Sequence, residues 1–378
     1  TKIPMTMMEE DVSDEEIMQY MQDTYLISKE KGELAIEIAR REKALLDTLH
    51  YEDGYSLYIG IPFCPTTCLY CSFTSYPLSA WEKRVDEYLD ALEKEIDYTA
   101  EQYRERHLNT IYIGGGTPTT LAPYQLDRLI RKIKSSFDLS HLLEFTVEAG
   151  RPDSITKEKL EVLRSHGISR ISINPQTMKE TLEIIGRHHT VEQTVQSFLT
   201  ARELGFDNIN MDLIVGLPNE NLEDVRHTME QLEELQPDNI TVHSLAIKRA
   251  ARLNMFKEDY TNLKMENTWE HIEVTADYCK RMGLQPYYLY RQKNMAGNFE
   301  NVGYAKEGKA GIYNILIMEE KQTIVACGAG ASTKRVWNTP NPDGTHRIER
   351  CENVKDVALY IERIDEMIER KKRLFAEE

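Results

Sequence analysis

Between residues 56 and 245 the chain alternates short apolar runs with longer amphipathic segments. The apolar runs fall at residues 56–61, 109–114, 143–149, 168–174, 208–215 and 239–245. Turns that contain Gly or Pro separate them from segments with helical spacing, at residues 82–105, 124–137, 156–167, 190–205 and 222–235. Nearly continuous apolar strands that alternate with helices are typical of a parallel sheet with helices outside it.

About six β/α units are too few for a complete barrel, which has eight. The pattern therefore predicts an α/β fold built on a partial (β/α)6 barrel. An open doubly wound sheet is the alternative that the same pattern allows.

The flanking sequence differs from this repeat. Acidic amphipathic residues 13–50 predict one or two packing helices. After about residue 250 we expect a polar crossover (248–267), a helix (267–283), a strand (284–291), a hairpin within 311–332 and a charged helix (354–375). These features predict three parts: an N-terminal helical segment (1–52), the partial barrel (53–250) and a smaller α+β C-terminal domain (251–378).

Composition and charge narrow the class of protein. The 378 residues carry a net charge of −17, which argues against nucleic acid as the main partner. No apolar run approaches the roughly 18 residues of a membrane span, and the acidic N-terminus lacks the apolar core of a signal peptide. Six cysteines are too few for a disulfide scaffold, so we expect a cytoplasmic protein with reduced thiols. Because the chain begins with Thr1 rather than Met, we also expect a longer parent protein.

Three of the six cysteines lie close together, in the stretch YIGIPFCPTTCLYCSF. Cys64, Cys68 and Cys71 have the spacing C-x3-C-x2-C, and the other cysteines are more than two hundred residues away. A structural zinc site takes four protein ligands, commonly as two C-x2-C pairs. Three thiolates on one loop suit an iron–sulfur cluster with one iron left open for chemistry. A zinc loop or unligated cysteines are the alternatives, and we interpret Cys279, Cys327 and Cys351 as isolated buried thiols.

Glycines and polar residues recur at the predicted carboxyl ends of the strands, where barrel enzymes keep their sites. The stretch IYIGGGTPTTL (111–121) places three glycines where backbone can approach a ligand and free amides can bind an anion. Glu148 ends one strand, and Gln176 follows the next. Asp212 lies between apolar residues and therefore needs a partner, such as neighbouring loop amides or a ligand.

The stretch IGRHHT precedes a predicted helix and holds three further candidates. Arg187 is either a ligand-binding cation or a solvated charge. His188 and His189 are more often surface residues than ligands.

The cysteine motif resembles that of the radical S-adenosylmethionine (radical SAM) family. The resemblance implies a 4Fe–4S cluster on Cys64, Cys68 and Cys71, whose open iron chelates the amino and carboxylate groups of SAM. An electron from the reduced cluster would cleave the sulfonium and give a 5′-deoxyadenosyl radical, which abstracts hydrogen from an unactivated carbon. In this family the GGGTP stretch contacts the methionine moiety of SAM.

The resemblance is closer to one group within this family, the oxygen-independent coproporphyrinogen III oxidases. It rests on Y-x-G-I-P-F-C-x3-C-x-Y-C, GGGTPT, the NxDLIxGLP pattern at residues 210–218 and GAGAS at 328–332, and covers the chain from about residue 50. The stretch LYRQKNMAGNFENVGYAKEG is similar to the anaerobic coproporphyrinogen dehydrogenase branch of Gram-positive bacteria. The implied reaction belongs to haem biosynthesis: oxidative decarboxylation of two propionates of coproporphyrinogen III to the vinyl groups of protoporphyrinogen IX.

The resemblance also implies cofactor contacts, residue by residue. Positions that match contacts to the cluster-bound SAM are Tyr58, Gly115 and Glu148. Positions that match contacts to a second SAM are Tyr70, Gly116, Thr117, Gln176, Arg187, Asp212 and Ala246. One or two SAM molecules are therefore expected, with a donor such as flavodoxin or ferredoxin for the electron. For the substrate carboxylates our candidates are Lys248, Arg249 and Arg291, with surface charge as their alternative.

A related group of a different class consists of haem chaperones, which bind and transfer haem. Their late motif is His-Asn-x-x-Tyr-Trp, and the matching stretch here is GNFENVGYA. Gly297 occupies the His position and no Trp follows. Because loss of that imidazole removes a common ligand of haem iron, the sequence favours the biosynthetic enzyme. Another radical SAM reaction, such as methyl transfer or cyclisation on a different substrate, is the remaining alternative.

Overall fold

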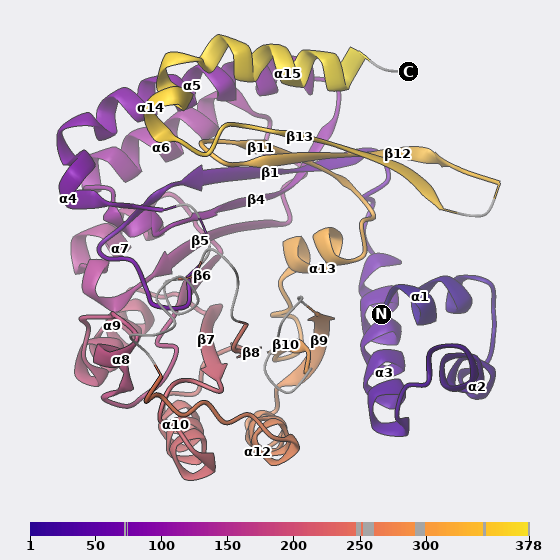
Figure 1. Ribbon diagram of the computed structural model, residues 1–378. Coiled ribbons are helices and arrows are strands. Elements are labelled where there is room, and N and C mark those ends of the chain that lie inside the picture. Colours follow the sequence, from indigo (N-terminus) through magenta and orange to yellow (C-terminus); the bar gives the residue numbers. More distant parts are fainter. Residues whose placement is uncertain are drawn as a thin grey trace.

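The computed structural model describes residues 1–71, 73, 75–246, 251, 261–291, 299–342 and 345–376. Within these residues eleven strands form one sheet, in the order β13-β12-β11-β1-β4-β5-β6-β7-β8-β10-β9 (Figure 1). Its strands are β1 (Gly54–Ile61), β4 (His107–Gly115), β5 (Glu144–Gly150), β6 (Arg170–Ile173), β7 (Ile209–Val215), β8 (Asn239–Ser244), β9 (Gln285–Tyr290), β10 (Asn301–Ala305), β11 (Thr323–Cys327), β12 (Ser332–Pro340) and β13 (His346–Glu352). A second, small sheet pairs β2 (Phe63–Cys64) with β3 (Tyr76–Pro77).

Helices fill the intervals between these strands and both ends of the chain. Those before and within the barrel are α1 (Lys2–Glu9), α2 (Asp14–Tyr25), α3 (Lys29–Leu46), α4 (Leu78–Trp81), α5 (Val85–Gln102), α6 (Pro123–Ser136), α7 (Lys157–Ser165), α8 (Thr181–Ile184), α9 (Val191–Glu203) and α10 (Leu222–Leu235). The later helices are α12 (Trp269–Arg281), α13 (Ile312–Met318), α14 (Val357–Glu362) and α15 (Ile364–Ala376). Short 3₁₀ helices span Glu82–Arg84, Pro118–Thr120 and Pro152–Ser154.

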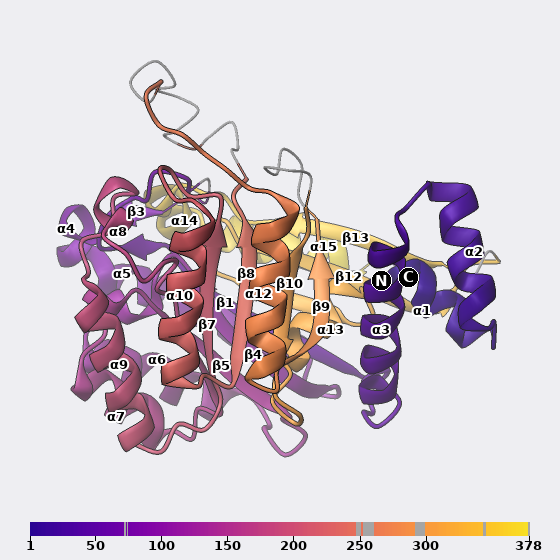
Figure 2. The same cartoon turned by 90° about the horizontal axis from the view of Figure 1, so that it is seen from below.

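The centre of the molecule is a partial (β/α)6 barrel, as the alternating pattern predicts. Strands β1, β4, β5, β6, β7 and β8 are neighbours in chain order and pair in parallel. Helices α5, α6, α7, α9 and α10 lie along the outside of this curved sheet (Figures 1 and 2). A doubly wound sheet would carry such helices on both faces, so the barrel interpretation is confirmed.

Local sequence explains where several of these helices begin. Thr156, Thr190 and Asn221 precede α7, α9 and α10, and each side chain accepts a hydrogen bond from a backbone N–H of the first turn. Such caps satisfy donors that have no partner inside the helix. The apolar faces of these helices are buried, and so are all four residues of strand β6.

The hairpin predicted within residues 311–332 is wrong in its first half. Residues 312–318 form helix α13, whose Tyr313, Ile315 and Leu316 are buried. The carboxylate of Glu144, on β5, accepts hydrogen bonds from the backbone N–H groups of Ile312 (2.7 Å) and Tyr313 (3.3 Å). This capping from a distant strand favours helix over strand at the start of an otherwise ambiguous apolar run. The second run forms β11, which pairs in parallel with β1.

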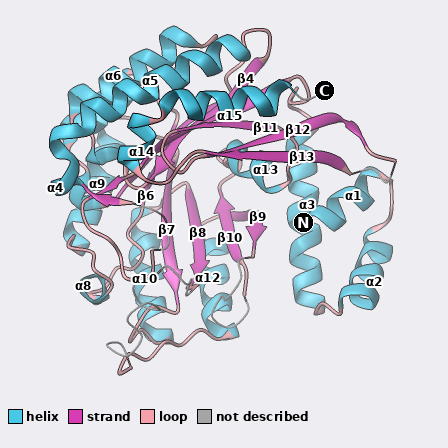
Figure 3. Ribbon diagram, turned by 45° about the horizontal axis from the view of Figure 1, so that its top comes forward, coloured by secondary structure: helices cyan, strands magenta, loops and turns pink. Residues whose placement is uncertain are grey.

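The C-terminal strands extend the barrel sheet at both of its edges. Strands β10 and β9 continue it in antiparallel fashion beyond β8. Strands β12 and β13 do so beyond β11, and α14 and α15 lie beside α5 (Figure 3). The division into parts at residues 52 and 250 stays a prediction. Residues 13–50, for which the sequence predicts one or two helices, form α2 and α3, and an unpredicted helix, α1, precedes them.

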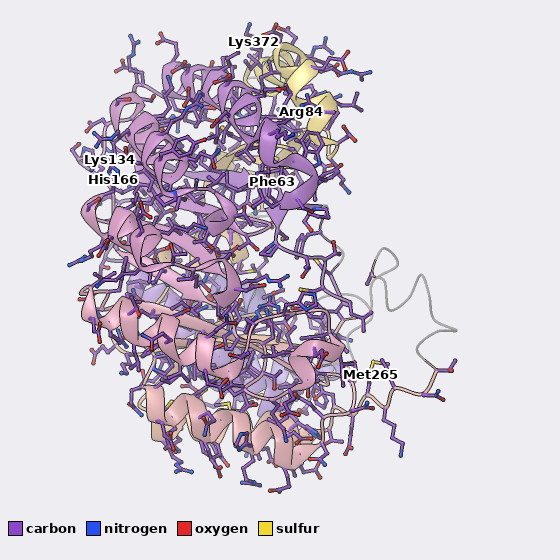
Figure 4. All side chains as sticks on the ribbon, turned by 90° about the vertical axis from the view of Figure 1, so that its left-hand side faces the viewer. Phe63, Arg84, Lys134, His166, Met265 and Lys372 are labelled. Atoms are coloured by element: carbon purple, nitrogen blue, oxygen red, sulfur yellow. The ribbon has the colours of Figure 1, made fainter. Side chains whose placement is uncertain are left out.

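The two ends of the barrel are distinct in side view. Phe63, just beyond β1, lies on the opposite side from Lys134, in the last turn of α6, and His166, which ends α7 (Figure 4). The carboxyl ends of the parallel strands therefore open on the side of Phe63. None of the helices that the described residues form combines the length and apolar character that a bilayer span requires.

We expect the substitution Glu42→Gln to stabilise the packing of α3 at alkaline pH. Glu42 is fully buried, and burial, together with the neighbouring Glu319, raises its pKa from 4.5 to about 10. A carboxyl whose folded pKa is raised keeps its proton on folding, so its contribution to stability is lost as pH rises from about 4.5 towards about 10. The substitution should raise the free energy of unfolding by at least about 1 kcal/mol at pH 9 and by less at pH 6.

Urea unfolding at pH 6 and pH 9 measures this effect. The matched control is Glu33→Gln, on an exposed position of the same helix. An equal pH dependence of stability in Glu42→Gln and in the unsubstituted protein would contradict the assignment.

Candidate functional site

A cavity of about 330 Å³ opens at the carboxyl ends of the barrel strands. Twelve of the thirteen candidate cluster and cofactor residues line it: Cys64, Cys68, Tyr70, Cys71, Gly115, Gly116, Thr117, Glu148, Gln176, Arg187, Asp212 and Ala246. The thirteenth, Tyr58, lines an adjoining cavity of about 150 Å³ that shares Gly115 and Gly116 with the first. Residues spread over almost two hundred positions of sequence are therefore gathered at one end of the barrel.

The cysteine loop, which leads from Cys64 in β2 to Tyr76 in β3, is held at both ends and in its middle. Its ends are joined because β2, which contains Cys64, pairs with β3. In the middle, the backbone N–H of Leu69 donates to the carbonyl of Ile185 (2.9 Å). The hydroxyl of Thr66 donates to the carbonyl of Gly186 (2.9 Å). These bonds fix the loop against the segment between α8 and α9.

Hydrogen-bond donors approach the sulfur atoms of this loop. The Thr117 hydroxyl lies 3.4 Å from Cys64 Sγ, and Arg151 Nη1 lies 3.9 Å from Cys68 Sγ. Burial raises the pKa of the Cys64 thiol, and raises the pKa of Cys71 to about 11. At neutral pH these two groups are therefore thiols in the free protein, and binding of a metal would release their protons.

The three glycines pack the end of β4 against the chain that leads into the cysteines. Gly115 has φ +110°, and a Cβ atom on Gly116 would lie 2.5 Å from the carbonyl oxygen of Phe63. The N–H groups of Gly116 and Thr117 donate to the carbonyls of Ile61 and Phe63, both at 2.7 Å. The expectation that these amides are free for an anion is therefore wrong for these two groups. The glycines instead permit close backbone approach beside Cys64.

Glu148 lies on the inner face of the barrel beside a row of stacked rings. Its carboxylate accepts a hydrogen bond from the Tyr112 hydroxyl. The Tyr112 ring stacks on Tyr58 on one side and Tyr313 on the other, with centroid distances of 6.1 and 4.6 Å. Burial raises the pKa of Glu148 to about 7, an effect that Tyr112 opposes and Asp212 reinforces. Glu148 can therefore change its charge near neutral pH.

Asp212 has the partners that its apolar neighbours require. Asn210 Nδ2 donates to Oδ1 (2.7 Å), and His243 Nε2 lies 3.5 Å from Oδ2. Burial alone would raise the pKa of this carboxyl, but the hydrogen bonds from His243, Asn210 and Thr241 hold it below its usual value. The partners are thus side chains rather than the loop amides considered above. His243 also links Asp212 to Tyr290, because its Nδ1 lies 3.4 Å from the Tyr290 hydroxyl.

Gln176 and Arg187 also line the cavity. Gln176 has φ +66°, held by bonds from its N–H to the Asp212 carbonyl (3.0 Å) and from the Ile214 N–H to its own carbonyl (2.9 Å). A non-glycine residue in this conformation is strained, and such strain is common at functional sites. Its buried Oε1 has no hydrogen-bond partner among the described residues.

Arg187 is only 7% exposed, and its Nη1 donates to the carbonyl of Asn174 (2.5 Å). The alternative of a solvated charge is therefore wrong. His188 is exposed, as expected, but His189 is buried. Burial, together with the charge of Arg187, lowers the pKa of His189 to about 4, so this imidazole is neutral.

Sequence reasoning missed several residues of the cavity wall. The additional polar side chains that line it are Ser75, Arg151, Asn174, His243, Ser244, Tyr290 and Asn301. The strand-end rule that selects Glu148 also applies to Arg151 and His243, because they lie beyond β5 and near the end of β8. Arg291 is exposed and lines another cavity, of about 610 Å³, which is bounded by α3 and α13 and shares Tyr290 with the first. Lys248, Arg249 and Gly297 lie outside the described residues.

Comparisons with known proteins identify the family of this chain. A profile of the Radical SAM superfamily matches residues 58–232. The oxygen-independent coproporphyrinogen-III oxidase-like protein HemZ of Bacillus subtilis (strain 168) is 43% identical over 98% of this chain and 74% of its own length. The heme chaperone HemW of the same organism is 36% identical over 73% of this chain and 70% of its own.

Among solved structures, coproporphyrinogen III oxidase (HemN) from Escherichia coli superposes with a TM-score of 0.66. The match covers 86% of this chain and 73% of that one at 23% identity, which shows the shared fold alone. The sequence match to HemZ spans nearly the whole chain. The chain belongs to the radical SAM superfamily and, within it, to the group that contains the oxygen-independent coproporphyrinogen III oxidase-like proteins.

Proposed function

We propose that this protein is a radical SAM oxidoreductase that decarboxylates coproporphyrinogen III to protoporphyrinogen IX without oxygen. The observation that carries the proposal is the convergence of three cysteines, the glycine stretch and the polar strand-end residues on one cavity. The name of the HemZ relative, which matches nearly the whole chain, supports the choice of substrate.

Membership of the superfamily implies a 4Fe–4S cluster and SAM, and the residues present fit both. Three thiols from one loop face the cavity, with hydrogen-bond donors at two of the sulfurs. In the described part of the chain, no three His, Cys, Asp or Glu side chains are close enough to hold one metal ion. A cluster binds each thiolate through a different iron atom and therefore suits a wider spacing. When bound, the reduced cluster and SAM supply hydrogen-atom abstraction from an unactivated carbon.

We assign the protein's part in this chemistry to three groups of side chains. Cys64, Cys68 and Cys71 hold the cluster and leave one iron for SAM. Tyr58, Gly115 and Glu148 contact that SAM. The wall formed by Tyr70, Gly116, Thr117, Gln176, Arg187, Asp212 and Ala246 holds a second ligand, for which a second SAM is our proposal. A cavity of about 330 Å³ lies at the lower end of ordinary ligand-binding volumes, about 300–1,000 Å³.

The proposed reaction removes one hydrogen atom, one electron and carbon dioxide from each propionate. Loss of hydrogen from the β-carbon is followed by departure of carbon dioxide and transfer of an electron to an acceptor, which leaves a vinyl group. Such chemistry requires that bound substrate and cofactor exclude water, because water allows side reactions of a reactive carbon centre. The cofactor carries the difficult step, and the protein orients the reactants.

A second candidate function is haem binding and transfer. The match to the heme chaperone HemW, at 36% identity over 73% of the chain, favours it. The longer match to HemZ, together with Gly297 in place of the chaperones' His, favours the enzyme.

Anaerobic incubation of cluster-loaded protein with SAM, a reductant and coproporphyrinogen III distinguishes the two functions. Formation of vinyl product together with 5′-deoxyadenosine supports the enzyme. Transfer of haem to an acceptor apoprotein, without turnover of the porphyrinogen, would support the chaperone and contradict the enzyme.

We expect the affinity for SAM to fall below pH 7 because Glu148 becomes protonated. The buried carboxylate faces the proposed site of a cationic sulfonium ligand, and its pKa is about 7. If SAM binds only when Glu148 is ionised, the Kd for SAM should rise about tenfold for each pH unit below the pKa of Glu148. Calorimetric titration with SAM between pH 5.5 and pH 8 measures this dependence.

The variant Glu148→Gln should bind SAM weakly and show no pH dependence in this range. Glu158→Gln, on an exposed position of α7, is the matched control. Equal affinities of the unsubstituted protein at pH 5.5 and pH 8 would exclude this role for Glu148.

A further inference from the structure

We propose that Arg151 positions the cysteine loop and raises the reduction potential of the cluster. The inference rests on the cluster assigned above to Cys64, Cys68 and Cys71, and not on the identity of the substrate. Arg151 follows β5 directly and lines the cavity wall beside Cys68.

The contacts of Arg151 reach the cysteine loop itself. Its Nη1 donates to the carbonyl and to the hydroxyl of Thr66, both at 2.8 Å, and lies 3.9 Å from Cys68 Sγ. The residue is only 2% exposed. A single nitrogen, Nη1, therefore bonds the start of the loop to the end of β5 and also approaches the sulfur of Cys68, a proposed cluster ligand.

Asp153 holds the guanidinium in this orientation. Nη2 and Nε of Arg151 donate to the two carboxylate oxygens of Asp153, at 2.7 and 3.0 Å. Such a paired, planar arrangement fixes direction as well as distance. Because Nη2 and Nε are engaged by Asp153, Nη1 is the nitrogen that points to the loop.

The position of this charge has a predictable effect on the cluster. Reduction potentials of iron–sulfur clusters depend on net charge and on hydrogen bonds to the sulfurs. One-electron reduction makes the cluster more negative, so a fixed positive charge beside Cys68 stabilises the reduced form. The negative charge of Asp153 has the opposite effect and destabilises the reduced cluster. This effect is weaker, because Asp153 lies beyond the guanidinium group of Arg151. Buried charges are weakly screened, so both effects are expected to be measurable.

The experiment is a redox titration of cluster-loaded protein, with the reduced cluster followed by electron paramagnetic resonance. A chemical reductant of low potential supplies one electron to each cluster. Arg151→Gln is expected to lower the equilibrium constant for reduction by about tenfold, a shift of about 59 mV for one electron. Asp153→Asn is expected to shift the potential in the opposite direction.

Two further variants separate charge from positioning. Arg151→Lys keeps the charge but loses the planar pairing, so its potential should stay near that of the unsubstituted protein while its iron content falls. Arg202→Gln breaks a partly buried pair, between Arg202 Nη1 and Asp238 Oδ2 (2.6 Å), away from the cavity, and should leave the potential unchanged.

Opposite shifts in Arg151→Gln and Asp153→Asn would establish the electrostatic role. If Arg151→Gln retains no iron, the upward shift in Asp153→Asn still tests it. Unchanged potentials, or shifts of the same sign in both variants, would overturn the inference, as would failure of the unsubstituted protein to bind a cluster. A protein that holds the cluster but does not convert coproporphyrinogen III would refute only the proposed substrate.

Discussion

Replacement of Cys68 by serine is expected to abolish iron–sulfur absorption and all SAM-dependent activity. Cys68 lies in the middle of the proposed ligand set, is buried and receives the contact from Arg151. A serine hydroxyl is a poor substitute for a thiolate at iron, so the cluster loses one of only three protein ligands. The expected result is loss of the band at roughly 400 nm, of bound iron and of 5′-deoxyadenosine formation.

The control for this substitution is a cysteine outside the loop. Cys351, on β13, is partly exposed and lies more than two hundred residues beyond the three cysteines of the loop. Cys351→Ser should keep the iron content and the activity of the unsubstituted protein. If Cys68→Ser retained its iron, or if Cys351→Ser lost it, the proposed ligand set would be wrong.

Replacement of Lys371 by methionine is expected to destabilise the protein by about 3–5 kcal/mol. Lys371, on α15, and Glu95, on α5, form an ion pair of 2.5 Å with side-chain exposures of 1% and 0%. Removal of the ammonium leaves a buried carboxylate without its counter-charge, and that cost is far larger than the value of a surface pair. Chemical unfolding at neutral pH measures the loss.

The same substitution should weaken the binding of SAM. Glu95 also accepts hydrogen bonds from the backbone N–H of Gly328 (2.6 Å) and from the Tyr360 hydroxyl (2.9 Å). Residues 329–331, which follow Gly328, line the smaller cavity beside Tyr58. A disturbed Glu95 therefore displaces a wall of the proposed cofactor site, some distance from the cysteines.

Two variants check this explanation. The double variant Glu95→Gln with Lys371→Met removes both charges and should recover part of the stability lost in the single variant. Arg370→Gln removes an exposed pair with Glu366 and an exposed hydrogen bond to the carbonyl of Glu352 (2.9 Å), and should cost less than about 1 kcal/mol. A loss below 1 kcal/mol in Lys371→Met would show that the buried pair does not have this role.

The repeating part of the fold could be predicted from the sequence because each strand and helix carries its own periodicity. The order of β1, β4, β5, β6, β7 and β8 follows directly from that repeat. Residues 312–318 could not be assigned in this way, because a short apolar run suits both a strand and a buried helix. The cap that Glu144 provides comes from a strand almost 170 residues earlier, and no local pattern reveals it. Strands β10, β12 and β13 depend on long-range pairing in the same way, whereas β9 matches the strand predicted at residues 284–291.

Some residues of the candidate site could likewise be identified from the sequence, and others could not. Cys64, Glu148 and Asp212 could be found because they break apolar patterns at strand ends or share a tight motif. His243 and Arg151 act through neighbours that are distant in sequence, namely Asp212 and the cysteine loop. The burial of His189 likewise follows from the packing of its segment against that loop, and the single sequence carries no signal for it.

The most direct test of the account is the electron paramagnetic resonance spectrum of the anaerobically reduced protein, recorded with and without SAM. Three cysteine ligands predict a reduced 4Fe–4S signal whose shape changes when SAM occupies the fourth iron. A protein that contains only zinc, or a cluster whose spectrum is the same with saturating SAM, would contradict the account.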